Sequence, residues 1–165
     1  MPTSEVQLSR EYDLPVAIVW DALVDEDLVE GWLATARVEP RVGGHYWLDW
    51  QSGIRPAPTS GTITAFAPPG SPEGCRLGIE TDNLGILDFT LTPTPDGTRG
   101  SGTLVTLHLL VDIEPRLLAS TRAHWKTNFD QLGDLLRGHP VDWSTWQQDR
   151  GDAWAEYLRE ADGTN

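Results

Sequence analysis

The residue types that commonly perform chemistry are present in this chain, but their spacing forms no catalytic or metal-binding signature. The four histidines are His45, His108, His124 and His139, and no two of them lie three or four residues apart on one predicted helix. Cys75 is the only cysteine, which excludes an internal disulfide and a metal site built from several thiolates. We therefore expect no metal ion and no other cofactor.

Nucleophile and acid–base patterns are missing as well. No serine lies in the turn that exposes a catalytic hydroxyl in hydrolases, and the carboxylates Glu80, Asp82 and Asp88 form no distinctive pair. Gly43-Gly44 reads as a turn, because a dinucleotide-binding loop needs a further glycine and a following helix. The sequence thus predicts no catalytic residues, and we expect a protein that is not an enzyme.

The strongest pattern is a helical stripe near the C-terminus. Its members recur at steps of three and four residues: Leu118, Arg122, Trp125, Phe129, Leu132 and Leu136. In a helix this spacing puts the side chains on one face, and a mostly apolar face must cover another apolar surface. The region from about Ala34 to Asp112 instead reads as short strands. One long helix laid across one antiparallel sheet is an α+β architecture that can enclose a cavity.

Turn and capping residues divide the chain into its elements. A first strand is predicted over Val6–Asp13, followed by a helix that Pro15 opens and a short helix that Asp25 caps and Gly31 ends. The pair Asp96-Gly97 predicts a hairpin turn between the last two strands. The strands predicted after the helices are Ala34–Pro40, His45–Gln51, Gly61–Phe66, Arg76–Thr81, Ile86–Thr92 and Thr103–Asp112.

This order of elements resembles the SRPBCC (START-like) superfamily, and local motifs support the resemblance over about residues 5 to 138. The motifs are Leu14–Asp25, Leu28–Trp32, Val42–Tyr46, Gly61–Ile63, Gly102–Leu107 and Trp125–Leu136. Within the superfamily the chain is most similar to the proteins named after the activator of the heat-shock-protein-90 ATPase. One departure is His124, because the family usually has glycine before the tryptophan at position 125.

The resemblance implies the helix-grip fold, in which a curved antiparallel sheet wraps around a long C-terminal helix. The cavity of this fold lies between that helix and the concave face of the sheet, where apolar side chains with a few polar tips form a pocket. The predicted ligand-binding residues are Tyr46, Leu48, Trp50, Leu87, Phe89, Leu107, Arg122, Trp125, Phe129 and Leu132. As an alternative, the apolar members pack together as a solid core, and Arg122 extends to solvent or pairs with a neighbouring carboxylate.

The last part of the chain has no counterpart in the family pattern. We predict a helix-grip domain over residues 1–140 and a helical extension of the same domain over residues 141–165. The apolar stripe of the extension includes Trp146, Trp154, Tyr157 and Leu158, which is too apolar to remain free in water. The outer face of the sheet at Leu104 and Leu110 is the predicted docking surface, on the same chain or on a twofold partner.

Composition limits the partners and the location of the protein. The formal charge of −13 and the pI near 4.5 argue against nucleic acid and anionic membranes. No apolar run approaches membrane-spanning length and no signal peptide is present, so we expect a cytoplasmic protein that is a monomer or homodimer. Lys126 is the only lysine, an arginine bias typical of a GC-rich bacterial genome.

The function that these observations favour is binding of a small hydrophobic or amphipathic ligand in the cavity between the C-terminal helix and the sheet. One alternative is an enzyme with cyclase- or hydrolase-like chemistry in the same cavity, which would need polar groups converging inside it. The other is a protein-interaction module that resembles a chaperone cofactor, which would need a filled cavity and an exposed apolar patch.

Overall fold

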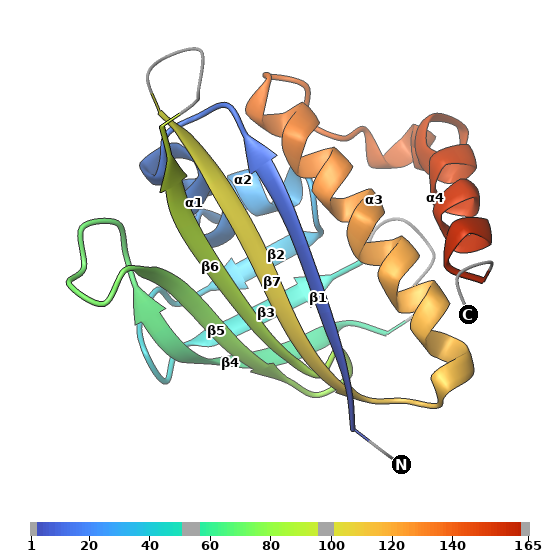
Figure 1. Cartoon of the computed structure of the whole chain (residues 1–165), viewed down its shortest axis with the longest axis horizontal. Helices are drawn as coiled ribbons and strands as arrows, with labels where there is room; N and C mark the ends of the chain where they lie inside the picture. Colours follow the sequence, from blue (N-terminus) through green and yellow to red (C-terminus); the bar gives the residue numbers. More distant parts are fainter. Residues whose placement is uncertain (1–2, 51–56, 96–100, 163–165) are drawn as a thin grey trace.

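The computed structural model describes residues 3–50, 57–95 and 101–162 (Figure 1). In chain order the elements are β1 (Thr3–Tyr12), α1 (Val16–Val24), α2 (Glu26–Glu30), β2 (Thr35–Val38), β3 (His45–Asp49), β4 (Thr59–Ala67), β5 (Cys75–Thr81), β6 (Ile86–Thr94), β7 (Gly102–Asp112), the 3₁₀ turn η1 (Pro115–Leu117), α3 (Leu118–Leu136), the 3₁₀ turn η2 (Trp143–Thr145) and α4 (Trp146–Asp162). The predicted helices and strands are confirmed, with ends that differ by a few residues.

All strands belong to one antiparallel sheet in the order β1-β7-β6-β5-β4-β3-β2, and α3 lies across its concave face (Figure 1). A register shift between Ile63 and Ala65 lets β4 bend, as bulges do, and so helps the sheet to curve. β6 and β7 form the expected hairpin, although its predicted turn at Asp96-Gly97 lies outside the described residues. The α+β helix-grip fold is therefore confirmed.

The two short helices begin and end where their capping residues predict. Pro15 precedes the first turn of α1, and the Asp25 carboxylate accepts a hydrogen bond from the Asp27 backbone N–H at the start of α2. The Trp32 indole N–H donates to the Ala22 carbonyl at 2.7 Å, which ties the end of α2 to α1. Because α1 contacts β6, β7 and α3, the pair closes the groove at the end where α3 finishes.

The core forms where the apolar side of α3 meets the alternating inward residues of the sheet. Trp125, Phe129 and Leu132 are almost fully buried, as their spacing predicts. Leu118 and Leu136, at the two ends of the stripe, are only partly buried. The largest fully buried side chains are Leu23, Trp32, Leu48, Ile63, Leu77, Ile79, Leu87, Phe89, Leu107, Leu109, Trp125 and Phe129.

α4 packs against the side of α3 that faces away from the sheet (Figure 1). The Trp146 indole N–H donates to the Gln131 side-chain oxygen at 2.7 Å, and the Tyr157 hydroxyl donates to the Asp130 carboxylate at 2.6 Å. An ion pair between Arg150 and Asp134 adds a third tie between the two helices. Docking of α4 on its own chain is consistent with the apolar stripe of the extension.

The predicted docking surface for α4, the outer face of the sheet, is wrong. Leu110 on that face is exposed, and no contact between α4 and the sheet is recorded among the described residues beyond isolated pairs. The reason lies on α3, where Asp130, Gln131 and Asp134 present acceptors that the indole, phenol and guanidinium groups of α4 can satisfy. On the outer strand face the polar groups pair with one another instead, as His108 does with Glu5 and Ser9 with Thr106.

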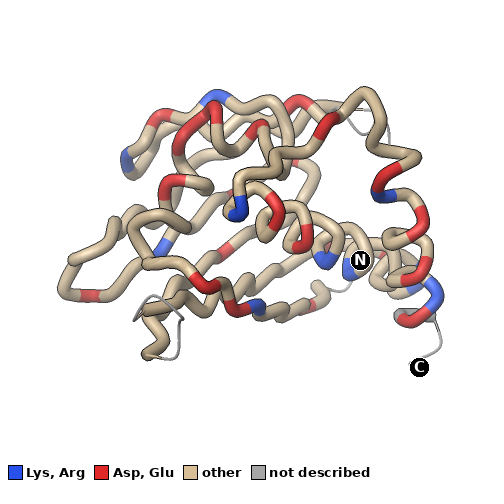
Figure 2. Tube along the Cα trace, turned by 90° about the horizontal axis from the view of Figure 1, so that it is seen from above, with Lys and Arg blue, Asp and Glu red and all other residues tan. Residues whose placement is uncertain are grey.

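The surface is acidic on several elements at once. Figure 2 shows Asp and Glu positions distributed along helices and connecting segments, and within the described residues the Lys and Arg positions are scattered along the trace. Among the same residues, no helix combines the length and the apolar character needed to cross a bilayer. The net charge of −13 thus belongs to the whole surface rather than to one binding face.

Phe129→Ala should lower the free energy of unfolding by about 3–5 kcal/mol, the usual range for a tightly packed phenylalanine. Phe129 is 1% exposed, so the substitution removes a complete buried ring. Urea denaturation followed by tryptophan fluorescence measures the change. Leu117→Ala is the control, because its side chain is 42% exposed and should change stability by less than about 0.5 kcal/mol. A small effect of Phe129→Ala would show that the ring is not tightly packed.

Removal of residues 141–165 should lower the melting temperature, because α3 would lose the buried packing of Trp146 and the hydrogen bonds that α4 makes to Asp130 and Gln131. Since α4 docks on its own chain, the truncated protein should keep the oligomeric state of the full chain. Light scattering and thermal unfolding of both proteins make the test. A change from dimer to monomer on truncation would instead show that the extension docks on a partner.

Candidate ligand-binding site

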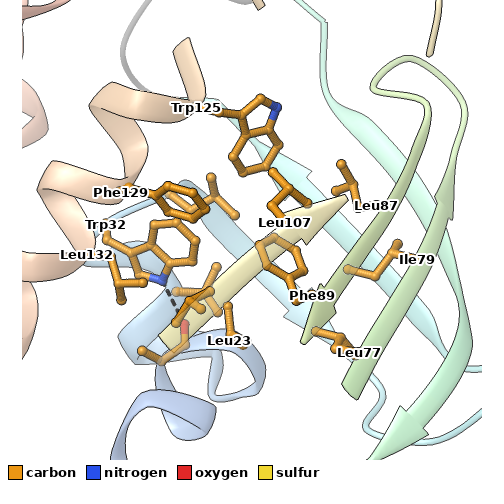
Figure 3. Close-up of a cluster of buried hydrophobic side chains, with 14 of the residues drawn as sticks. Leu23, Trp32, Leu77, Ile79, Leu87, Phe89, Leu107, Trp125, Phe129 and Leu132 are labelled. Carbon is orange, nitrogen blue, oxygen red and sulfur yellow. Dashed lines mark hydrogen bonds between the residues drawn. The ribbon is translucent and has the colours of Figure 1, made fainter. Parts of the chain in front are cut away.

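The interior between α3 and the sheet contains most of the predicted ligand-binding residues (Figure 3). Trp125 and Phe129 extend from α3 toward the side chains of Phe89 and Leu107 on the sheet (Figure 3). The Phe89 and Trp125 rings meet edge to face, with 6.1 Å between their centroids, a geometry that aromatic quadrupoles favour. The predicted residues of this group, all buried, are Leu48, Leu87, Phe89, Leu107, Trp125, Phe129 and Leu132.

The two predicted polar tips, those of Tyr46 and Trp50, already have protein partners. The Tyr46 hydroxyl donates to the Leu23 carbonyl at 2.7 Å, and burial raises the pKa of its phenol well above the ordinary value. The Trp50 indole N–H donates to the Thr59 hydroxyl at 2.9 Å. Both side chains therefore hold α1 and β4 in place around the core, which the sequence pattern alone did not show.

Arg122 lies apart from the buried group. It is half-buried on α3, and no ion pair is recorded for it among the described residues. Its neighbours on the helix, Thr121 and His124, line a pocket that does not include Arg122 itself. The structure thus does not bring the guanidinium together with the other predicted contacts.

A pocket of about 210 Å³ opens at the end of the groove where α3 begins. It lies between the β5–β6 turn, the segment after β7, η1 and the first turns of α3. Its lining consists of Asn83, Leu84, Val111, Ile113, Leu117, Ser120, Thr121, His124 and Trp125. Of the predicted residues only Trp125 takes part. The signal for the others was available, because Leu117, Thr121 and His124 recur at helical spacing beside the apolar stripe.

A chain of hydrogen-bonded polar groups reaches this pocket at Asn83. The Thr59 hydroxyl accepts from the Trp50 indole and donates to the Asn83 side-chain oxygen at 2.6 Å. The His124 ring meets the Trp50 ring edge to face, with 5.7 Å between centroids. The histidine in the place of the family's usual glycine therefore has a clear position, against Trp50 and on the pocket wall.

A second pocket, of about 710 Å³, lies at the opposite strand ends, and Cys75 is part of its lining. The thiol is buried, and burial raises its pKa to about 11. A raised pKa keeps the sulfur in the unreactive thiol form. No group of histidine, cysteine or carboxylate side chains suited to a metal ion occurs among the described residues.

The fold and the groove define a helix-grip protein, and comparison of the sequence with known families identifies one family within this class. The profile of the family described as "Activator of Hsp90 ATPase homolog 1-like protein" matches residues 13–137. The chain belongs to this family of the SRPBCC superfamily. The match ends at the last turn of α3, so η2 and α4 lie beyond it. Among curated proteins, none is significantly similar in sequence.

Solved structures with the same fold support the assignment. Protein MLL2253 from Mesorhizobium loti is 23% identical, with a TM-score of 0.66 over 84% of this chain and 100% of its own. CalU16 from Micromonospora echinospora is 27% identical, with a TM-score of 0.60 over 93% of this chain and 88% of its own. A conserved protein of unknown function from Enterococcus faecalis, EF2215, is 18% identical, with a TM-score of 0.65 over 99% of this chain and 87% of its own. Family and fold are consistent with a ligand-binding module.

Alkylation of Cys75 by iodoacetamide should be slow at pH 8 and should accelerate as the pH rises toward about 11. At pH 8, three units below this pKa, only about a thousandth of the thiol is ionised. Intact mass spectrometry at a series of pH values gives the rate, with the protein in denaturing urea as the control. A rate that levels off below pH 9 in the folded protein would contradict the burial of the thiol.

Proposed function

We propose that the protein binds a small amphipathic ligand at the end of the groove where α3 begins. The observation that carries the proposal is the pocket of about 210 Å³, whose lining combines apolar side chains with a few polar groups around the Trp125 ring. A buried cavity of about 150 Å³ is large enough for benzene. The pocket therefore suits a single aromatic ring, or a short aliphatic chain, with one small polar substituent.

In this proposal the predicted ligand-binding residues have two roles. Trp125 contacts the ligand directly, since it forms part of the pocket wall. The residues deeper in the groove support that ring and set the depth of the pocket, and the edge-to-face contact of Phe89 with Trp125 is one such support.

Binding is favoured over hydrolytic or cyclase chemistry by the character of the lining. Among the described lining residues His124 is the only ionisable side chain besides hydroxyl groups. General acid–base catalysis needs a group that takes up a proton and usually a second that supplies one. The pocket offers a shaped, mostly neutral surface, and this suits recognition of a ligand more than its conversion.

Acetophenone should bind the wild-type protein saturably and raise its melting temperature with concentration, as mass action requires. Leu84→Trp, which fills the pocket with a larger ring, should abolish both effects. Leu84 is 4% exposed and lines the pocket, whereas Ile86 is 43% exposed and lies outside it. Ile86→Trp is therefore the matched control and should bind normally. Calorimetric titration decides, and equal affinity of the two variants would refute a site at this pocket.

A further inference from the structure

Asn128 has a buried side-chain amide whose oxygen accepts a hydrogen bond, whereas its nitrogen donates none among the described residues. The residue is 4% exposed, and within the described part of the chain its side-chain nitrogen Nδ2 has no hydrogen-bond partner. A buried donor without a partner has lost its hydrogen bonds to water and gained nothing in return, so native proteins rarely keep one without a reason. An acceptor brought by a ligand would satisfy it.

The orientation of this amide is determined by a chain of hydrogen bonds that starts on α4. The Trp146 indole N–H can only donate, so the oxygen of Gln131 faces it, at 2.7 Å. The nitrogen of Gln131 in turn donates to the Trp32 carbonyl at 2.6 Å and to the Asn128 side-chain oxygen at 3.4 Å. Reversing the Asn128 amide would set two N–H groups against each other, so Nδ2 must lie on the side away from Gln131.

Asn128 lies one turn further along α3 than the residues that line the pocket. Thr121, His124 and Asn128 follow one another at steps of three and four residues, which puts them along one side of the helix. Thr121 and His124 form part of the pocket wall, and Trp125 completes it. Asn128 is therefore the next polar residue along α3 from the pocket toward the interior of the groove.

We propose that the Asn128 amide donates a hydrogen bond to an uncharged carbonyl oxygen of the bound ligand, and that α4 holds the amide in the orientation this requires. The inference rests on the proposed function and adds to it the chemical class of the ligand: an apolar ketone, ester or amide. A neutral oxygen is favoured over a carboxylate, because a buried anion with only a neutral amide as its partner is poorly stabilised. The overall charge of −13 also opposes an anionic ligand.

The test compares two probes of nearly the same shape, acetophenone and ethylbenzene, which differ in whether a carbonyl oxygen is present. Their affinity ratio is measured by calorimetric titration for the wild type and for Asn128→Leu. Loss of one neutral hydrogen bond should shift the ratio about threefold to tenfold against acetophenone. Benzoate, with the same ring and a negative charge, should bind the wild type more weakly than acetophenone does.

Two further variants test the role of α4. Trp146→Phe removes the indole N–H that orients Gln131, so the preference for acetophenone should fall. Trp143→Phe is the matched control, because its indole N–H donates at 2.7 Å to the Glu30 carbonyl and has no link to Gln131. This variant should keep the wild-type ratio. An unchanged ratio in Trp146→Phe, or an equal fall in both variants, would refute the positioning role of α4.

A measurement on the wild type makes the result independent of whether Asn128→Leu folds. In a ¹H–¹⁵N spectrum the side-chain amide signals of Asn128 should shift on addition of acetophenone and stay in place with ethylbenzene. If both probes bind but the ratio and these signals do not change, Asn128 is purely structural and the inference is wrong, while the proposed function stands. If neither probe binds, the proposed function itself fails and the inference with it.

Discussion

The burial of α3 on nearly all of its sides is the constraint on which the rest of the structure depends. Phe129 and Leu132 on one side of the helix are covered by the concave face of the sheet. The Tyr12 hydroxyl of β1 donates to the Phe129 carbonyl at 2.8 Å, which attaches the edge strand to the same helix. On the far side, α4 packs along the helix, and its Trp146 indole N–H donates to the Gln131 side-chain oxygen. The first turns of the helix are less completely covered, and the pocket of the proposed ligand site lies there.

Periodicity was sufficient to predict the helices and strands because the decisive patterns are long. Trp125, Phe129 and Leu132 can share a face only in a helix. Along each strand, apolar and polar residues alternate, so only one set of alternate side chains can point into the core. Caps such as Asp25 added the boundaries. These are local properties, and local chemistry determines them. The family motifs then supplied the arrangement of the elements, which periodicity alone leaves open.

The position of α4 could not be predicted in the same manner. An apolar stripe with Trp146 and Tyr157 shows that a helix must dock, but it does not say on which surface. The answer depended on Asp130 and Gln131, polar residues that look like a solvated helix face in the sequence. Their role becomes apparent only when the donors on α4 are placed opposite them. Matching of polar groups, rather than apolar area, selected the docking surface.

In the candidate site, too, the sequence predicted the apolar positions but not the hydrogen-bond partners of the polar atoms. The apolar positions of the groove, such as Phe89, follow from strand parity. The partners of polar atoms do not, because the Tyr46 hydroxyl bonds to a carbonyl 23 residues away in the sequence. In the sequence His124 appeared as a histidine without metal spacing and as a departure from the family's usual glycine, and its place on the pocket wall depends on its packing against Trp50.

The buried polar residues His124, Asn128 and Gln131 form a second stripe beside the apolar stripe of α3, and the two stripes have separate roles. The apolar stripe stabilises the fold, and its contribution depends on area rather than on the direction of any bond. The polar stripe contributes little net stability, because each of its hydrogen bonds replaces one made to water. It does restrict orientation, since the side chain of Gln131 has one arrangement that satisfies both Trp32 and Trp146. Groups fixed in this way select among ligands of similar apolar size by where their polar atoms lie, which an apolar wall cannot do.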